Sequence, residues 1–397
     1  MVLIAARAGY AYNWFDIGPA LPRIGATFGV GPADWGLLVA LFLVGAGAFQ
    51  VPAGFLARRF GGRAISLGGI GLLAAAGAGG ALAPTFGWLL VSRLVAGVGA
   101  ALFFSPAISL VASLFPAGRR GVPVGAFSSA FSAGAAVGVL GTALLIPLVD
   151  WRAALALGGV GLGLLTLLTT IAVPRSAGAP APPLRRERPG VPAALRFRGV
   201  WAIGLGFVGF EGATFATGQF IVPFGEAVRG WSAAVAGAVG MMFVLPSVVG
   251  GPIGGSVAER RPNHRTQLAI VTIAGAAVLA LVPYAGVAAA IAIGAVFSFS
   301  YGFAYAVMYV LPHYWPSIPS EEIPLAIGLF NAVQLAGGAL VSFAFGWLIE
   351  VRSYAFAWEA VAALQAATLV ALLALPRTPS VGRPVVAARG PPAGPSP

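Results

Sequence analysis

The feature that most constrains this chain is a succession of apolar runs about 20 residues long, separated by short polar stretches. Such runs match the roughly 30 Å hydrocarbon core of a lipid bilayer. Within lipid, only α-helices and closed β-barrels satisfy every backbone group. The runs are continuous rather than alternating, which favours helices over barrel strands. The sequence therefore predicts an all-α polytopic membrane protein.

The composition excludes most other protein classes. Of the 397 residues, 59% are hydrophobic and only 9% are charged, whereas soluble domains carry about 25% charged residues. The net charge is +12, but its arginines lie mainly in short breaks between apolar runs, where they indicate topology and contact with anionic lipid. We therefore expect no nucleic-acid partner. Cysteine is absent, which excludes disulfides, thiol catalysis and cysteine-ligated metals.

Twelve spanning segments are predicted from the alternation of apolar runs and polar breaks, although Gly and Pro within several runs leave ten or eleven open. The predicted segments are 4–22, 35–57, 64–83, 87–112, 122–148, 153–173, 199–224, 232–257, 267–284, 287–311, 323–349 and 354–375. The first run continues past residue 20 without a small-residue cleavage site, so no cleavable signal peptide is expected.

The distribution of arginine predicts the orientation. The even-numbered breaks and the tail hold seventeen arginines, against four in the odd-numbered breaks. By the positive-inside rule, both termini are expected in the cytoplasm of a protein of the cell membrane. The Pro- and Arg-rich break 175–198 lies near mid-chain, so it predicts a cytoplasmic linker between bundles at 1–174 and 199–376, followed by a disordered tail at 377–397.

The two halves repeat each other at an offset of about 200 residues, which is typical of transporters. Pro22 corresponds to Pro223 and Pro123 to Pro324, each at the same place in its half. Three stretches resemble the major facilitator superfamily of secondary transporters: "GFLARRFGGR" at 54–63, "RLVAGVGAA" at 93–101, and the glycine-rich run from "LFPAGRR" to "DWRAAL". The resemblance implies two pseudo-symmetric six-helix bundles with a central cavity, but it does not indicate the solute.

Ionisable residues at membrane depth are functional candidates, because they are costly to bury. Asp16 and Arg93 lie at similar depths in the first and fourth segments, and the resemblance places both segments beside the cavity. This pair either binds substrate charge and relays protons or is a structural ion pair. Glu211 lies near the middle of the seventh segment, and because burial disfavours the charged carboxylate it is a candidate proton carrier. Its alternative is a neutral, hydrogen-bonded packing residue.

Further polar and aromatic residues are candidates for the substrate pathway. They are Asn13, Tyr10, Gln50, Gln219, Tyr301, Tyr305, Asn331 and Gln334. Tyr301, Tyr305 and Tyr309 recur every four residues, a stripe that serves either packing or recognition. Arg7 lies near the predicted inner boundary and is expected to extend its side chain to the headgroups. The two histidines are far apart in loop edges, so neither a metal nor a cofactor is expected.

The stretch at 54–63 predicts a cytoplasmic latch between the halves. Gly54, Arg59, Gly61 and Arg63 match the superfamily pattern, whereas Arg58 replaces its aspartate. The resemblance implies that this aspartate meets the start of the eleventh helix, which here is preceded by two glutamates. We therefore expect exchanged charges in a latch made of two clusters. These are Arg58 and Arg59 with Glu321 and Glu322, and Glu259 with Arg119 and Arg120. The alternative is ordinary topology-determining arginines.

The sequence thus predicts a monomeric secondary transporter, embedded in lipid, that moves a small solute by alternating access with a coupling proton or ion. Glycines at 125, 134 and 138 resemble the antiporter signature of drug exporters, although they also permit close helix packing. Drug or metabolite efflux and organic-anion uptake therefore stay open. The alternatives outside transport are a transporter-like sensor or regulator and a membrane-embedded enzyme. No D-x-x-D, HExxH or phosphate-binding loop supports the enzyme.

Overall fold

The computed structural model describes residues 1–116, 121–178, 192–261, 263–319 and 322–376, and these residues form helices and no strands. The helices of the first half are α1 (Val2–Phe15), α2 (Ile17–Phe28), α3 (Pro32–Phe60), α4 (Gly62–Ala81), α5 (Phe86–Ser113), α6 (Gly121–Leu145) and α7 (Trp151–Ala172). The remaining α-helices are α8 (Ala193–Arg196), α9 (Arg198–Arg229), α10 (Ala233–Met242), α11 (Ser247–Arg260), α12 (His264–Leu279), α13 (Val287–Val310), α14 (Ile323–Val351) and α15 (Tyr354–Leu373).

Eleven helical spans in the described chain are long and apolar enough to cross a membrane. The first predicted segment is not among them, because it is divided at Asp16 into α1 and α2. Pro19 and Pro22 follow the break, and a proline cannot donate a hydrogen bond to the carbonyl four residues earlier. Together α1 and α2 supply the twelfth crossing that the hydropathy predicts.

The eighth predicted segment is also discontinuous. It consists of α10 and α11, separated by a turn that ends at Pro246. The first backbone N–H of α11, at Ser247, donates instead to the Ser298 hydroxyl of α13 at 3.0 Å. A helix interruption at membrane depth is tolerated where other protein groups satisfy the backbone or where it borders a cavity. Both conditions hold here, as the site geometry below shows.

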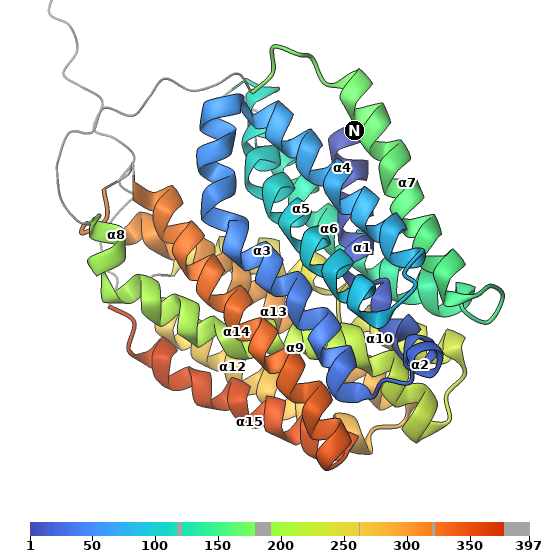
Figure 1. Cartoon of the computed structure of the whole chain (residues 1–397). Helices are drawn as coiled ribbons and strands as arrows, with labels where there is room; N and C mark the ends of the chain where they lie inside the picture. Colours follow the sequence, from blue (N-terminus) through green and yellow to red (C-terminus); the bar gives the residue numbers. More distant parts are fainter. Residues whose placement is uncertain (117–120, 179–191, 262, 320–321, 377–397) are drawn as a thin grey trace, which may run out of the picture.

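The helices from the two halves of the chain lie on opposite sides of the molecule (Figure 1). Within the first half, α4 packs against α5 and α7, and α1 packs against α6. Within the second, α13 packs against α11 and α12, and α9 against α14 and α15. Between the halves, α3 lies along α14, α6 meets α10, and α2 meets α9. Three pairs of helices therefore frame the space between the halves.

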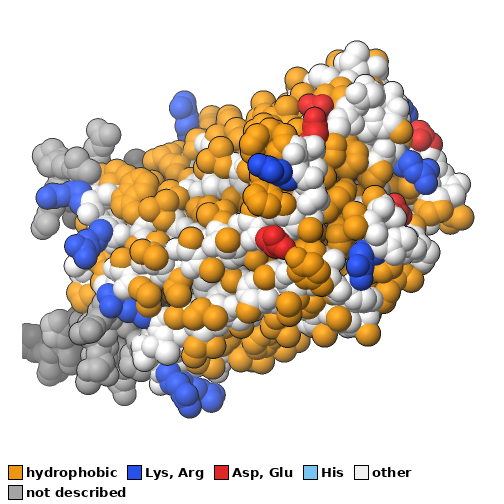
Figure 2. Space-filling view, turned by 90° about the horizontal axis from the view of Figure 1, so that it is seen from below, with side chains coloured by type: hydrophobic (Ala, Val, Ile, Leu, Met, Phe, Trp, Pro, Cys, Tyr) orange, Lys and Arg blue, Asp and Glu red, His pale blue; other side chains and the backbone are white. Residues whose placement is uncertain are grey.

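The outer surface is apolar, as a lipid-facing surface must be. Figure 2 shows one face covered largely by hydrophobic side chains, with basic side chains alone toward one end and acidic ones toward the other. On α7, for example, Leu164, Leu167 and Ile171 are 60%, 58% and 75% exposed. In water such a surface would drive aggregation. The exposed apolar side chains are therefore those of a multi-pass membrane protein surrounded by lipid.

Glycines let α6 approach α1 closely. A methyl group on Gly134 would overlap the backbone of Ala8, and one on Gly138 would lie 2.7 Å from the Tyr12 carbonyl oxygen. Around Gly125 there is open space within 4 Å. Two of the three glycines that resemble an antiporter signature are therefore explained by helix packing alone.

Candidate functional site

A cavity of about 750 Å³ lies between the two halves. Its walls come from α1, α3, α5 and α6 on one side and from α9, α11, α13 and α14 on the other. The cavity reaches the arginine-rich end of the molecule, where one lining residue, Val122 at the start of α6, is 84% exposed. A space of this size is in the range of small-molecule binding sites.

The opposite end of the space between the halves is closed. The Phe15 and Phe215 rings stack across it, with centroids 5.5 Å apart and planes 2° from parallel. Beside them, Gln219 Nε2 donates to the Trp14 carbonyl at 2.7 Å. Farther out, the Ala33 N–H at the start of α3 donates to Glu350 Oε2 of α14 at 3.0 Å. The cavity therefore opens toward one end of the molecule only.

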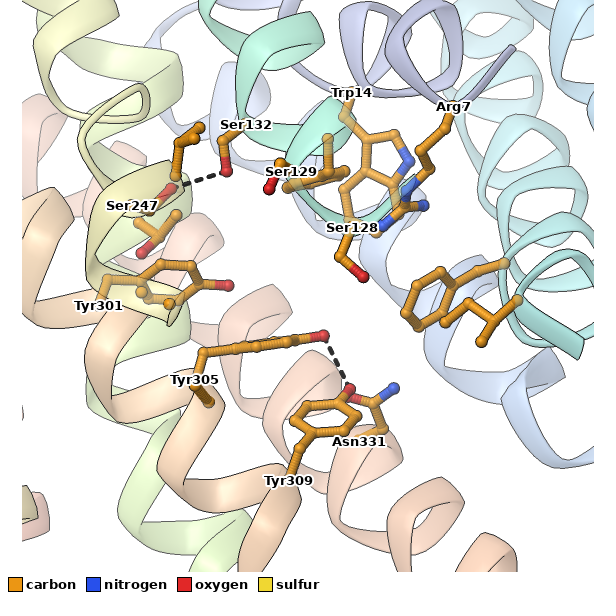
Figure 3. A pocket seen from close by; sticks show the side chains of 18 of the residues that line it. Arg7, Trp14, Ser128, Ser129, Ser132, Ser247, Tyr301, Tyr305, Tyr309 and Asn331 are labelled. Carbon is orange, nitrogen blue, oxygen red and sulfur yellow. Dashed lines mark hydrogen bonds between the residues drawn. The ribbon is translucent and has the colours of Figure 1, made fainter. Parts of the chain in front are cut away.

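Arg7 is the basic residue in the described cavity wall. Its side chain is 6% exposed, and its guanidinium carbon lies 4.4 Å from the ring centroids of both Tyr10 and Phe104. Phe131 and Phe127 complete the cage at 4.7 and 5.5 Å. Figure 3 shows Arg7 pointing into the cavity beside Trp14. The expectation that Arg7 reaches the headgroups is therefore wrong, because rings from α5 and α6 hold it inside.

The facing wall carries a chain of hydrogen bonds. Tyr301 donates its hydroxyl proton to Glu211 Oε2 at 3.1 Å. Below it, Tyr305 donates to the Tyr309 hydroxyl at 2.8 Å, and Tyr309 donates to Asn331 Oδ1 at 2.8 Å (Figure 3). Asn331 also accepts a short hydrogen bond from Gln334. All of these groups line the cavity, so the tyrosine stripe of α13 faces the cavity rather than serving packing alone.

Serines that the sequence analysis did not single out complete the site. Ser128, Ser129 and Ser132 of α6 line the cavity together with Ser247 of α11. The hydroxyls of Ser132 and Ser247 lie 2.7 Å apart and join the two halves (Figure 3). The available signal was the hydroxyl cluster in "FSSAFS", on the glycine-rich run that carries part of the superfamily resemblance.

The structure places all but one of the predicted pathway residues in one of two cavities. Those that line the main cavity are Tyr10, Gln50, Glu211, Tyr301, Tyr305, Asn331 and Gln334. Those that line a second, much smaller cavity within the first half are Asn13, Asp16 and Arg93. Gln219 belongs to neither, because it lies in the closed end. Helix α1 thus presents Arg7, Tyr10 and Trp14 to one cavity, whereas Asn13 of α1 and Asp16, the residue directly after α1, line the other.

In the smaller cavity the charged groups are only partly satisfied. Arg93 Nη1 donates to the Asn13 carbonyl at 3.3 Å, and its guanidinium lies 4.5 Å from the Phe42 ring centroid. Asp16 Oδ1 and Arg93 Nε are buried and make no hydrogen bond within the described chain. The two side chains therefore share an enclosed space without direct contact between those atoms.

The described residues contain no group of three or more His, Asp or Glu side chains that could hold a metal ion.

The sequence profile of the Major Facilitator Superfamily matches residues 3–317, which is more than half of the chain. The chain belongs to the major facilitator superfamily. Two curated relatives are an uncharacterized MFS-type transporter of Mycobacterium tuberculosis and a chloramphenicol resistance protein of Streptomyces lividans. The first is 33% identical over 34% of this chain and 23% of the relative, so the match spans less than a quarter of its length. The second is 30% identical over 66% of this chain and 67% of the relative.

The fold agrees with this superfamily assignment. The solved structure of a D-xylose–proton symporter superposes with a TM-score of 0.73 and 15% identity, over 96% of this chain and 98% of the other. At that identity the likeness concerns the fold alone. It confirms the predicted architecture of twelve membrane-crossing segments in two bundles.

The residues of the predicted latch are only partly described in this superfamily member. Glu322 Oε2 accepts a hydrogen bond from the Ala194 N–H of α8 at 2.8 Å. Arg63 donates to the carbonyls of Thr170 and Val173, at the end of α7. Arg119, Arg120 and Glu321 lie outside the described residues. The latch stays a prediction, and it concerns the conformation in which the arginine-rich end is closed.

Proposed function

We propose that this protein is a secondary active transporter that moves a small solute by alternating access. The observation that carries the proposal is a cavity between two bundles, with aromatic walls and several polar side chains, that opens at the arginine-rich end and is closed by side chains at the other. Rocking of one bundle against the other around such a midplane site exposes it to each side in turn. An enzyme or a sensor does not need this arrangement.

The proposed topology follows from the arginine distribution. With both termini in the cytoplasm of a cell-membrane protein, the cavity opens to the cytoplasm, and the two bundles at 1–174 and 199–376 are the units that move. The chloramphenicol resistance relative favours export as the direction of transport. Uptake of an organic anion is the second candidate, and Arg7 in the cavity wall is the observation that favours it.

We assign the coupling proton to Glu211. Its side chain is 5% exposed, and Tyr301 is its hydrogen-bond donor. Since its hydrogen-bond partner is a neutral hydroxyl, this carboxyl group can take up and release a proton without breaking an ion pair. The carboxyl lies in the bundle that faces Arg7, so protonation at Glu211 and solute binding share one cavity.

The test is solute flux in proteoliposomes with an imposed pH gradient, using anionic, cationic and neutral solutes with chloramphenicol among them. We expect solute-dependent proton movement, reported by a pH-sensitive dye inside the vesicles. Glu211→Gln should abolish pH-driven accumulation while solute exchange and binding persist, because the amide cannot release a proton. Tyr301→Phe is the matched control, and it should retain coupling with an altered pH profile.

Two results would contradict these assignments separately. Normal pH-driven accumulation by Glu211→Gln would remove Glu211 as the proton carrier but leave transport intact. Absence of flux for every solute, in protein that is folded and monodisperse, would contradict transport itself and favour a sensor.

A further inference from the structure

Arg7 is a buried basic residue for which the described residues supply no ionic partner. Among the described residues it makes no ion pair, and its Nε and Nη1 atoms are buried without a hydrogen bond. An arginine side chain keeps its charge in proteins, and a buried charge without a partner is strongly unfavourable. The four surrounding rings attract the cation through their π faces but supply no negative charge and no hydrogen-bond acceptor for its N–H groups. The site therefore lacks a counter-charge.

The unused donors of Arg7 indicate how that counter-charge would bind. The N–H groups of a guanidinium point outward in its own plane. Tyr10, Phe104 and Phe131 surround the Arg7 guanidinium at 4.4 to 4.7 Å, but its Nε and Nη1 atoms make no hydrogen bond within the described chain, so donors along its edge are left for an acceptor. A carboxylate fits this edge with two parallel hydrogen bonds. A planar group attached to that carboxylate would then lie between aromatic rings.

The charge balance of the cavity favours a single negative charge. Arg7 is the basic side chain and Glu211 the acidic one among the described residues that line it. A ligand with two negative charges would leave one uncompensated in a water-poor space, which is costly. A cation would meet the Arg7 guanidinium without a free carboxylate nearby, because Glu211 lies on the other bundle and is already hydrogen-bonded to Tyr301.

The remainder of the cavity suits an apolar, flat body with a few polar substituents. Phe131 and Trp14 lie on the Arg7 side, and Tyr301 and Tyr305 project from α13 opposite them (Figure 3). Ser128 offers a hydroxyl beside Arg7. Aromatic walls with a small number of placed polar groups are typical of sites for ring-containing small molecules.

We propose that the cavity binds a monoanionic solute, a carboxylate attached to a flat aromatic body, with the carboxylate on the in-plane N–H groups of Arg7. This inference deepens the proposed function and rests on it for the fate of the solute, but binding itself does not require transport. Arg7 belongs to the bundle opposite Glu211, so the solute anion and the coupling proton would be held by different bundles. Their simultaneous binding would bring no net charge into the cavity.

The experiment compares three isosteric probes on purified full-length protein: 1-naphthoate, 1-naphthamide and 1-naphthylmethylammonium. Binding is measured by calorimetry and by the shift in melting temperature. Naphthoate should bind and stabilise the protein, and the amide and the ammonium should bind at least roughly 30-fold more weakly, as for loss of a buried charge-assisted pair. Equal binding of the amide, preference for the ammonium, or failure of all three to bind would overturn the proposal.

Two substitutions at Arg7 locate the site. Arg7→Met should lose the preference for naphthoate, and Arg7→Lys should keep only a small part of it, because lysine cannot form two parallel hydrogen bonds. Without any probe, Arg7→Met should melt at a higher temperature than the parent, since it removes an uncompensated buried charge. If Arg7→Met keeps the preference for naphthoate, the carboxylate does not bind at Arg7. If Arg7→Met melts at a lower temperature than the parent, Arg7 stabilises the fold instead of awaiting a ligand.

A matched arginine gives the control. Arg152 also lies over aromatic rings, but its Nη1 donates to the carbonyls of Ala81 and Ala83 at 3.1 and 2.6 Å. Arg152→Met should therefore lower the melting temperature and leave the preference for naphthoate unchanged. If naphthoate binds at Arg7 but no solute is transported, the binding site stands and the proposed transport fails. If other solutes are transported and naphthoate does not bind, the proposed transport stands and the proposed binding site fails.

Discussion

Single residues of α1 show how one helix can serve two chemical sites. Arg7, Tyr10 and Trp14 recur at intervals of three and four residues, so they share the face toward the main cavity. Asn13 lines the smaller cavity together with Asp16, the residue that directly follows α1, and with Arg93 of α5. A change in the charge of Asp16 would act at the end of the helix that carries Arg7. Substitutions of Asp16 and Arg93 therefore test whether this pair is structural or also relays protons.

We expect the single substitutions Asp16→Asn and Arg93→Met to destabilise the protein, because each leaves one charge buried without its counterpart. Loss of one partner of a buried ion pair in contact costs about 3–5 kcal/mol. Since no hydrogen bond joins Asp16 to Arg93, we expect a smaller loss here, most of which the double substitution should recover. Thermal unfolding in detergent measures it. If the pair also relays protons, the double variant will fold well yet fail in pH-driven flux. Full recovery of flux would show that the pair is only structural.

At the scale of secondary-structure elements, close packing and interruption of helices account for the shape of the cavity. Helix α6 approaches α1 through Gly134 and Gly138, and this approach places Phe127 and Phe131 around Arg7. Across the cavity, the break between α10 and α11 brings Ser247 to Ser132. Glycines therefore allow α6 to lie close to α1, and the break that ends at Pro246 allows Ser247 to contact the other half.

Gly134→Ala should destabilise the protein by about 1–3 kcal/mol, the usual cost of overpacking, because its methyl group would overlap the Ala8 backbone. Gly141→Ala in the same helix is the control, since the nearest atoms would be 3.8 Å away. It should be neutral or slightly stabilising, as helix propensity favours alanine. Melting temperatures of the two variants decide the matter, and equal values would contradict the packing explanation of this glycine.

At the scale of the whole molecule, the closed end depends on contacts between the halves. The Glu350 carboxylate of α14 caps the start of α3 through the Ala33 N–H, and a negative charge is favourable at a helix N-terminus. Asp34 lies in the first turn of the same helix but makes no hydrogen bond or ion pair to a described residue. These two acids therefore separate the effect of contact between the halves from the effect of charge alone.

Glu350→Gln should weaken the closed end by about 0.3–1 kcal/mol and so raise the population open at that end about two- to fivefold. The chain has no cysteine, so a single Thr214→Cys in the cavity wall reports access. A membrane-impermeant thiol reagent added from the Glu350 side should label it correspondingly faster. Asp34→Asn should leave the rate unchanged, and an equal increase in both variants would argue against a contact-specific effect.

The sequence by itself was sufficient for the membrane environment and for the resemblance to the superfamily, because these depend on the length of apolar runs and on local motifs. It favoured twelve crossings but left ten or eleven open. It also selected Glu211, Tyr301, Tyr305 and Asn331 as candidates, since polar groups at membrane depth are few, and all four line the main cavity. It did not resolve which face of a helix each residue occupies.

Only the tertiary structure showed which residues of a helix face a cavity. Arg7 was expected at the headgroups because its depth was judged along one helix, whereas its environment is made by rings from α5 and α6. The same reason separates Asp16 and Arg93 from the main cavity and assigns Gln219 to the closed end. Depth in the membrane is a property of one segment, but exposure to a cavity depends on how several segments pack together.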